Sequence, residues 1–486
     1  MKKINIFLVG ILLIGFSACN KDFLDVLPSN QGDASTSIQT AADAKVMMAG
    51  LMRNMTSSSY YGRDFIMYAD AKGGDLTVYS RGRGLDGLYS FDHSPTVGAY
   101  SGFWNQIYFC IRQANNLLEN IEKLKTAGSQ ENFDNVKGQA LTARAIMYFD
   151  LVRLYGKTYL QDKAAFGVPN ITQTLDAYSQ PLRATVEENY TQIMKDLKDA
   201  APLLSKAKTN GFINYYANAA MNARVNLYMG KNTEALATAE EVIKATSVYS
   251  LYSNSNWVSS WTKPFGSESI FELGIYPSEG DLGNSSLSMY LRRKGHGSSS
   301  ALGFFMASDY FLNRLGADAN DVRWGVMSND EISTSHKGAS YKYSGSVAIE
   351  GDGKATVTAV NIKVIRLSEI YLIAAEAALP ANKTLAVGYL NKIRSRAPGL
   401  PPATESTITI DMILEERSKE LFTEGHRFFD MIRLNKTITF NDDLGGVPIA
   451  NRPKSIDRTF YKIILPISQA EINANPGIKA QQNPGY

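Results

Sequence analysis

The sequence predicts a mainly α-helical protein built from paired helices, with irregular loops and a few short strands. Apolar residues recur at helical spacing through most of the 486 residues. Two helical stretches carry small residues where a second helix would cross them, as helical repeats require. The composition, 44% hydrophobic and 20% charged, is that of a folded soluble chain. It excludes a disordered chain, a collagen-like fibre and a multi-span membrane protein.

The N-terminus has the features of a secretory signal. Two lysines precede an apolar run from Ile6 to Phe16, and small residues then lead to Cys19. As a helix the run would cover ~16 Å, too short for a ~30 Å hydrocarbon core. A cysteine directly after the small residues resembles a bacterial lipobox, so we expect a signal peptide 1–18 and lipidation of Cys19. The alternative is an ordinary secretion signal in which Cys19 falls at this place by chance.

Amphipathic periodicity predicts helices along most of the remaining chain. The predicted helices are 36–56, 103–125, 132–155, 185–205, 215–229, 232–246, 362–379, 383–396, 410–423 and 424–436. Two pairs among them are similar to tetratricopeptide hairpins. The first carries Ala223, Gly230, Ala235 and Val242, and the second carries Ala374, Ala386, Leu390 and Ile393. Such small and apolar residues let antiparallel helices approach closely and build a continuous core.

The region 250–350 differs from the rest, because it is rich in Ser and Gly and has few convincing helices. Within it, 267–276 shows the partial alternation of a strand. Just beyond it, Asp352 and Gly353 lie between two apolar runs and predict a hairpin turn. Long structureless loops are uncommon in compact domains. We therefore expect this region to pack on the helices and to carry function.

Motifs for catalysis, metal binding or nucleic-acid binding are missing from the sequence. The net charge of +3 gives no electrostatic case for nucleic acid or an anionic membrane surface. The four His are far apart in sequence, and no metal-ligand motif, phosphate loop or nucleophile elbow occurs. The G-x-G-x-x-G at 82–87 has no strand before it and no capped helix after it. In contrast, 26 Tyr and 21 Phe favour stacking surfaces.

Two other features are predicted to be structural. Cys110 lies in an apolar helical stretch with no His within ten residues, so we expect a buried thiol. A crowded charged cluster surrounds Gly425 near the C-terminus. Its members are Glu415, Glu416, Arg417, Glu420, Glu424, Arg427, Asp430 and Arg433. We expect these residues to form ion pairs that lock helix 410–423 to helix 424–436, with Glu424/Arg427 and Asp430/Arg433 spaced to bond along one helix.

Four ordered blocks of the sequence resemble one family, the SusD/RagB-like outer-membrane lipoproteins. Residues 19–28 are similar to its C-x-x-D-F-L-D-x-x-P start, and residues 104–115 to the W-x-x-x-Y-x-x-I-x-x-A-N pattern of its first long helix. ILEERSKELFTEGHRFFDMIRLNK (413–436) and YKIILPISQAEINANPGIKAQQNPGY (461–486) resemble its two C-terminal signatures. The blocks span almost the whole mature chain.

The resemblance implies a SusD-like fold with about four tetratricopeptide-like helix pairs. It implies one integrated unit made of a lipid-anchored segment 19–35, a helical part 36–250 and a C-terminal part 251–486. It also implies a non-enzymatic lipoprotein on the outer face of the cell outer membrane. Such a protein binds oligosaccharide or polysaccharide and delivers it to a SusC-like TonB-dependent transporter. No cofactor and no nucleic-acid partner are implied, and bound calcium is left open.

Candidate glycan contacts are sought among aromatic residues in loop-like segments, because a ring offers a flat apolar face to a pyranose. The aromatic candidates are Tyr79, Tyr89, Phe91, Tyr276, Tyr290 and Trp324. Polar contacts are expected from Arg81, Arg83 and Asp86. Trp104 belongs to the helix pattern and is predicted to be structural. Trp257 and Trp261 fit either role, since their four-residue spacing also suits a helix face.

Two other functions remain open at this point. RagB-like members of the family serve peptide import with the same fold, so the ligand could be a peptide or glycopeptide. A surface glycoside hydrolase would need two carboxylates at a fixed separation, which a single sequence cannot display. Binding tests with oligosaccharides and oligopeptides distinguish a glycan-binding protein from a peptide-binding one. Release of reducing sugar tests for a glycoside hydrolase.

Overall fold

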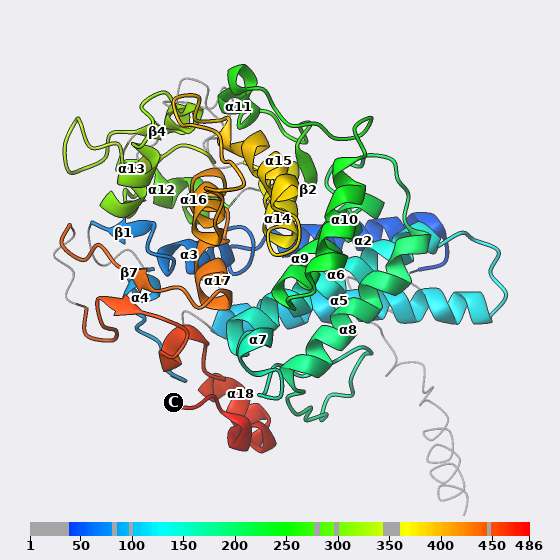
Figure 1. Cartoon of the computed structure of the whole chain (residues 1–486). Helices are drawn as coiled ribbons and strands as arrows, with labels where there is room; N and C mark the ends of the chain where they lie inside the picture. Colours follow the sequence, from blue (N-terminus) through cyan, green and yellow to red (C-terminus); the bar gives the residue numbers. More distant parts are fainter. Residues whose placement is uncertain are drawn as a thin grey trace, which may run out of the picture.

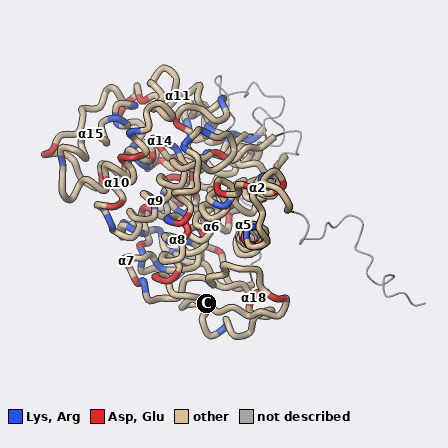
Figure 2. Tube along the Cα trace, turned by 90° about the vertical axis from the view of Figure 1, so that its right-hand side faces the viewer, with Lys and Arg blue, Asp and Glu red and all other residues tan. Residues whose placement is uncertain are grey.

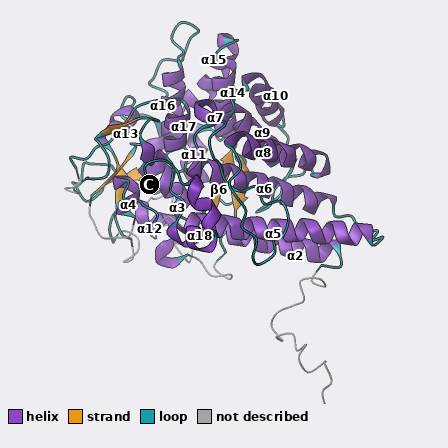
Figure 3. Cartoon of the chain, turned by 90° about the horizontal axis from the view of Figure 1, so that it is seen from below, coloured by secondary structure: helices purple, strands orange, loops and turns teal. Residues whose placement is uncertain are grey.

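The computed structural model describes residues 38–79, 85–96, 101–276, 282–295, 301–343, 360–444 and 449–486. Helices dominate these residues and the strands are few and short (Figure 3). The mainly α-helical fold predicted from the sequence is therefore confirmed. Several predicted features lie outside the described residues, namely the signal peptide 1–18, Cys19, segment 19–35, Arg81, Arg83 and the turn at Asp352–Gly353.

The N-terminal part is a layered stack of long helices (Figure 1). In chain order its helices are α2 (Ala41–Met55), α3 (Asp64–Ala71), α4 (Asp86–Ser90), α5 (Ser101–Thr126), α6 (Asp134–Tyr155), α7 (Tyr159–Asp162), α8 (Val186–Ala200), α9 (Tyr215–Tyr228) and α10 (Asn232–Ile243). Helix α5 packs on α2 and α6, α6 packs on α8, and α9 packs on α10. Thr40 and Thr185 begin α2 and α8 with capping boxes, in which each hydroxyl accepts a backbone N–H.

The C-terminal part adds shorter helices. They are α11 (Asn254–Ser260), α12 (Leu287–Leu291), α13 (Asp309–Leu315), α14 (Leu367–Ala378), α15 (Lys383–Arg394), α16 (Ile410–Glu420), α17 (Arg427–Arg433) and α18 (Gln469–Ala474). Helix α14 packs against both α10 and α15, so one row of helices continues from the first part into the second. The guanidinium of Arg224 on α9 also forms an ion pair with the carboxylate of Glu369 on α14, at 2.6 Å.

Both predicted hairpins are confirmed, as α9/α10 and α14/α15. Their small and apolar crossing residues are fully buried, namely Ala223, Ala235, Val242, Ala374, Ala386, Leu390 and Ile393. Gly230 turns the chain between α9 and α10 with φ +73°, a conformation that glycine adopts without steric penalty.

Within the described residues the strands form four two-stranded antiparallel sheets. β1 (Leu76–Val78) pairs with β3 (Phe305–Ala307), and β2 (Ser269–Leu273) pairs with β6 (Ile362–Arg366). β4 (Met327–Ser328) pairs with β5 (Ala339–Ser340), and β7 (Ile438–Thr439) pairs with β8 (Ser455–Ile456). Strand β2 confirms the strand predicted within 267–276. β1 follows α3 in the chain, and its pairing with β3, in which Leu76 is opposite Ala307, brings this part of the chain beside the region 301–343.

Three predicted helices begin later than expected. The helix predicted over 36–56 begins at Ala41, after the cap at Thr40. The helix predicted over 362–379 is wrong in its first five residues, which form β6. β-branched Ile362 and Ile365 pair there with Leu273 and Phe271 of β2. The helix predicted from 424 begins only at Arg427, since Gly425 has φ +83° and breaks the helical backbone.

Charged residues of both signs are spread along the part of the chain that the structure describes. Figure 2 shows basic and acidic residues intermixed along the trace, in keeping with the net charge of +3. None of the helices in the described ranges is long and apolar enough to cross a membrane.

Candidate ligand-binding site

Three of the predicted ligand aromatics lie in the core. The exposed fractions are 1% for Tyr89, 0% for Phe91 and 6% for Tyr290. The Tyr89 hydroxyl donates to the carboxylate of Asp442 at 2.8 Å, and the Tyr290 hydroxyl accepts from the guanidinium of Arg63 at 3.0 Å. None of the three rings presents a face to solvent, so we leave them out of the proposed ligand surface.

The other predicted contacts are more accessible. Tyr79, which follows β1, is 37% exposed, and Tyr276, which follows β2, is 43% exposed. Trp324 is partly buried, and its indole N–H donates to the carbonyl of Asp318 at 3.2 Å. Asp86 is the first residue of α4 and is also partly buried. None of the cavities described below is lined by these four residues.

The residues predicted to be structural are confirmed as such. Cys110 is fully buried in α5, and burial raises the pKa of its thiol to about 12, so it has little thiolate character. Trp104 is 6% exposed and donates its indole N–H to Glu471 at 3.1 Å. The ambiguous pair, Trp257 and Trp261, is buried with the rings edge to face, 5.8 Å between centroids.

The predicted ion pairs between the last two long helices are present. Arg417 on α16 binds Asp430 on α17 at 2.7 Å, and Asp430 also binds Arg433 at 2.9 Å. The pair expected between Glu424 and Arg427 is absent from the ion pairs of the described chain. Glu424 lies before α17 and binds other cations, while Arg427 binds Asp75.

A larger buried network lies beside these pairs, and we call it the charged core. It is made of Glu268, Arg323, Lys342, Arg366, Glu420 and Glu424. Arg366, at the end of β6, binds Glu424 at 2.7 Å, Glu268 at 3.0 Å and Glu420 at 3.1 Å. Lys342 binds Glu424 at 2.6 Å. Each cation here has carboxylate partners, which is the condition under which buried charge is tolerated.

The carboxylates of the charged core differ in the direction of their pKa shifts. Burial raises the pKa of Glu268 in spite of Arg366. Burial alone would raise the pKa of Glu420, but Arg366, Arg396 and Arg323 outweigh burial and lower the pKa to about 2. The pKa of Glu424 is likewise lowered, because Arg366 and Lys342 outweigh its burial. Both carboxylates are therefore ionised and bound to cations at neutral pH. Strongly shifted pKa values also occur in structural networks, as here.

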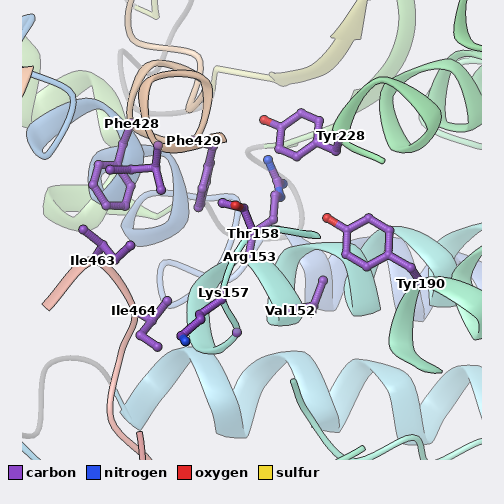
Figure 4. A pocket seen from close by; sticks show the side chains of 12 residues that line it. Val152, Arg153, Lys157, Thr158, Tyr190, Tyr228, Phe428, Phe429, Ile463 and Ile464 are labelled. Atoms are coloured by element: carbon purple, nitrogen blue, oxygen red, sulfur yellow. The ribbon is translucent and has the colours of Figure 1, made fainter. Parts of the chain in front are cut away.

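One cavity lies between α6, α17 and residues 463–464. Figure 4 shows the aromatic side chains of Tyr190, Tyr228, Phe428 and Phe429 around Arg153 at this place. The guanidinium of Arg153 lies 4.3 Å from the centroid of Phe429. The cavity has a volume of about 20 Å³, room for about one water-sized sphere and too little for a sugar ring.

A larger cleft opens between α13 and α17, and we call it the α13–α17 cleft. Its volume is about 310 Å³, at the lower end of the ~300–1,000 Å³ that ligand pockets occupy. It is lined by Gly73, Gly74, Asp75, Tyr310, Arg314, Arg427, Met431, Thr437, Ile438 and Thr439. Of the elements that line it, α13 and β7 lie on the left of the molecule in Figure 1.

The cleft combines an exposed ring with convergent polar groups. Tyr310 is 40% exposed in the first turn of α13. At the base of the cleft, Asp75 accepts from Arg314 Nη1 at 3.0 Å and from the Ser418 hydroxyl at 2.5 Å. Arg427 Nε lies 3.3 Å from Asp75 Oδ2, the oxygen that also accepts from Ser418. Such an arrangement can hold a sugar ring, because a ring face can stack on Tyr310 and the polar groups can bond hydroxyls.

The sequence analysis missed Tyr310, Arg314 and Asp75. Tyr310 and Arg314 are four residues apart, so one side of a helix carries an aromatic ring beside a guanidinium. That spacing was visible, but the helix stood in a region thought to be irregular. Asp75 is distant in sequence and joins the other two only in the folded chain.

A second groove of about 300 Å³ lies on α5, and we call it the α5 groove. Trp104, Tyr108 and Ile111 are part of its lining, with Arg112, Asp176 and Glu471 as its charged residues. Trp104, the tryptophan that lines it, is nearly fully buried, so the groove has less exposed aromatic face than the α13–α17 cleft. Within the described residues, no group of three or more His, Cys, Asp or Glu is arranged to hold a metal ion.

Two family models match the chain. One, described as SusD family, matches residues 320–486, and one, described as starch-binding associating with outer membrane, matches residues 22–227. Among curated proteins, SusD-like protein P2 of Formosa agariphila is 26% identical and the match covers 100% of both chains.

Solved structures share the fold. A laminarin-binding SusD-like protein is 23% identical, with a TM-score of 0.69 over 92% of this chain and 100% of its own. A SusD superfamily protein of Bacteroides thetaiotaomicron is 33% identical, with a TM-score of 0.84 over 92% of this chain and 100% of its own. Identity at this level over nearly the whole length, together with the two family models, means that the chain belongs to the SusD/RagB family.

Proposed function

We propose that this protein binds oligosaccharide or polysaccharide at the cell surface and passes it to a TonB-dependent outer-membrane transporter. The observation that carries the proposal is family membership, since the family model over residues 22–227 is described as starch-binding associating with outer membrane. A protein of the same fold binds laminarin. The chain acts as a binding protein without catalysis.

The α13–α17 cleft supports a glycan ligand. The exposed ring of Tyr310 offers a stacking face, and the threonine hydroxyls, two guanidiniums and one carboxylate around it can bond sugar hydroxyls. Tyr79 and Tyr276, both exposed, are proposed as further contacts for a longer chain of sugars.

The binding proposal is tested by calorimetry of the mature chain from residue 20 against glycans and mixed oligopeptides. We expect heat from at least one glycan, and Tyr310→Ala should weaken that binding about tenfold because a stacked ring is lost. Tyr461→Ala is the matched control, since Tyr461 is 43% exposed and lies outside the cleft. Heat from peptides alone would replace the glycan with a peptide ligand.

The absence of catalysis is tested with the glycan that binds. Incubation with this protein should release no reducing sugar above a heat-denatured control. Release of reducing sugar that disappears in single carboxylate variants would make the protein a glycoside hydrolase instead.

Membrane attachment and the transporter partner are tested in the native cell envelope. Cys19→Ala should move the protein out of the membrane fraction, because acyl chains at ~0.8 kcal/mol per buried CH₂ provide the anchor. Mild detergent extraction of the wild type should bring down a large β-barrel transporter. A Cys19→Ala protein still in the membrane fraction would contradict the lipid anchor, and extracts without a transporter would contradict the partner.

A further inference from the structure

We propose that the α13–α17 cleft selects acidic glycans, with Arg314 and Arg427 binding the carboxylate of a uronic acid while its ring stacks on Tyr310. This inference rests on the proposed function, because it assumes a saccharide in the cleft, and it names the class of that saccharide. Its basis is an excess of positive charge at the base of the cleft, beside the exposed ring.

The charged residues that line the cleft carry more positive than negative charge. Arg314 and Arg427 contribute two positive charges and Asp75 contributes one negative charge. Both guanidiniums are largely buried, with 18% of the Arg314 side chain and 12% of the Arg427 side chain exposed. A buried positive charge without its own counter-ion is unfavourable, so an anion in the cleft would stabilise this arrangement.

Other nearby carboxylates do not supply the missing charge. Asp430 acts on Arg427 electrostatically, but it is already shared by Arg417 and Arg433. Glu415 also acts on Arg427, but its side chain is exposed on α16 and solvent screens it. Burial is the main cause that lowers the pKa of Arg427, and Asp75 raises this pKa more than Arg314 lowers it. The excess of positive charge lies in the residues that line the cleft, where two guanidiniums stand against one carboxylate.

Both arginines keep N–H donors that could bind an anion. Arg314 uses Nη1 for Asp75 and for the Ser418 hydroxyl, at 3.0 and 2.7 Å. Arg427 makes one long bond from Nη1 to the carbonyl of Leu414, at 3.4 Å. Within the described chain no other hydrogen bond from these guanidiniums is present. A guanidinium fork with two free N–H groups matches the two oxygens of a carboxylate.

The ring and the charge are one helical turn apart. Tyr310 and Arg314 both lie on α13, and residues spaced by four lie on the same side of a helix. A uronate whose pyranose face covers the Tyr310 ring can therefore turn its carboxylate toward Arg314. The α5 groove has the opposite balance, with Asp176 and Glu471 against Arg112, and serves as an internal comparison.

The test uses ligand pairs that differ only in charge. Oligomers of galacturonate, of glucuronate and of mannuronate are each compared with their fully methyl-esterified forms, by calorimetry on the mature chain at low and at high salt. At least one acid should bind ten times more tightly than its ester, and the difference should shrink at high salt because screening weakens charge recognition.

Variants place the charge recognition in the cleft. Arg314→Gln should remove most of the difference between acid and ester, and Arg314→Lys should keep part of it, because lysine retains the charge without the planar fork. Arg112→Gln in the α5 groove is the matched control and should leave the difference unchanged. Thermal unfolding of each variant shows whether the fold is retained.

Two results would overturn the inference. If none of the three acids binds more tightly than its ester, the cleft does not select acidic glycans. This conclusion holds whether or not neutral glycans bind. If the preference survives in Arg314→Gln, it arises elsewhere on the protein. Binding of neutral glycans alone would leave the proposed function standing, whereas no binding to any acidic or neutral glycan would remove the proposed function as well.

Discussion

The charged core and the α13–α17 cleft are built from the same residue types but differ in how their charges are paired. In the charged core Arg366 reaches three carboxylates, all within 3.1 Å. In the cleft, one carboxylate, Asp75, serves both Arg314 and Arg427. The first is closed to solvent, while the second opens into about 310 Å³ of space.

This difference teaches how one protein can use buried arginines in two ways. Where no ligand can enter, the cations of the charged core are bound by protein carboxylates, because an unpaired charge in the interior is strongly destabilising. Where a cleft opens, part of the neutralisation can be left to a ligand. The charged core therefore contributes to the stability of the fold, and the cleft is the surface that we propose for recognition.

The largest effect is expected in the charged core. Glu420→Ala removes a fully buried carboxylate that accepts from Arg366 and from the Trp257 indole. Breaking a buried pair typically costs ~3–5 kcal/mol, because the partner charge stays buried. Urea unfolding monitored by circular dichroism measures it. A loss below ~1 kcal/mol would mean that the network is not a stabilising unit.

Acid should weaken the fold through carboxylates whose pKa is lowered by pairing. Burial alone would raise the pKa of Glu369, but Arg224 and His426 outweigh it and lower the pKa to about 2. A group whose pKa is lower in the folded state stabilises the fold above its unfolded pKa of 4.5. That stabilisation, roughly 3 kcal/mol, is lost as pH falls from 4.5 towards 2.

Glu369→Gln isolates this contribution. Unfolding free energies at several pH values should fall less steeply below pH 4.5 in Glu369→Gln than in the wild type, because the titrating group is gone. Equal slopes for the two proteins in this window would show that Glu369 is not responsible.

Removing the negative charge from the cleft should lower the stability of the fold and raise the affinity for an acidic ligand. Asp75→Asn removes the single carboxylate between Arg314 and Arg427, so we expect a loss of ~1–3 kcal/mol in the free energy of unfolding. Because the excess positive charge grows, affinity for an acidic oligomer should rise. Chemical denaturation and calorimetry measure the two effects. A variant that loses acidic-ligand affinity while staying folded would show that Asp75 positions the arginines more than it opposes the ligand.

The smallest effect is expected at an exposed pair. Lys195 and Asp199 on α8 lie 2.5 Å apart, with 65% and 45% of their side chains exposed. Solvent screening limits such pairs to at most ~0.5 kcal/mol, so Lys195→Ala should leave urea unfolding nearly unchanged. A loss close to that of Glu420→Ala would mean that burial does not explain the strength of the charged core.

Much of the fold could be predicted from local patterns. Periodicity located the long helices, and the small residues Ala223 and Ala235 marked a hairpin whose crossing is fully buried. Prediction was wrong just before α14, where the short stretch 362–366 suits a helix or a strand and only its pairing with β2 decides.

The candidate site was harder to predict than the fold. Whether an aromatic residue faces solvent depends on what packs over it. Other parts of the chain cover Tyr89, Phe91 and Tyr290, whereas Tyr79 and Tyr276 are exposed. Tyr310 was not among the predicted ligand contacts, because nothing near it in the sequence shows that Asp75 and Arg427 lie beside it in the folded chain.

By itself the sequence determined the helical class, the paired helices, the buried Cys110 and the family. These features depend on short-range spacing and on the order of motifs, which can be recognised without knowing any tertiary contact. Only the tertiary structure decided which charges share a partner and which rings stay exposed. Arg366 and Arg314 are alike as residues, and the difference between them comes from segments more than fifty positions away in the chain. Charge pairing and exposure are properties of such long-range contacts, so they exist only once the chain has folded.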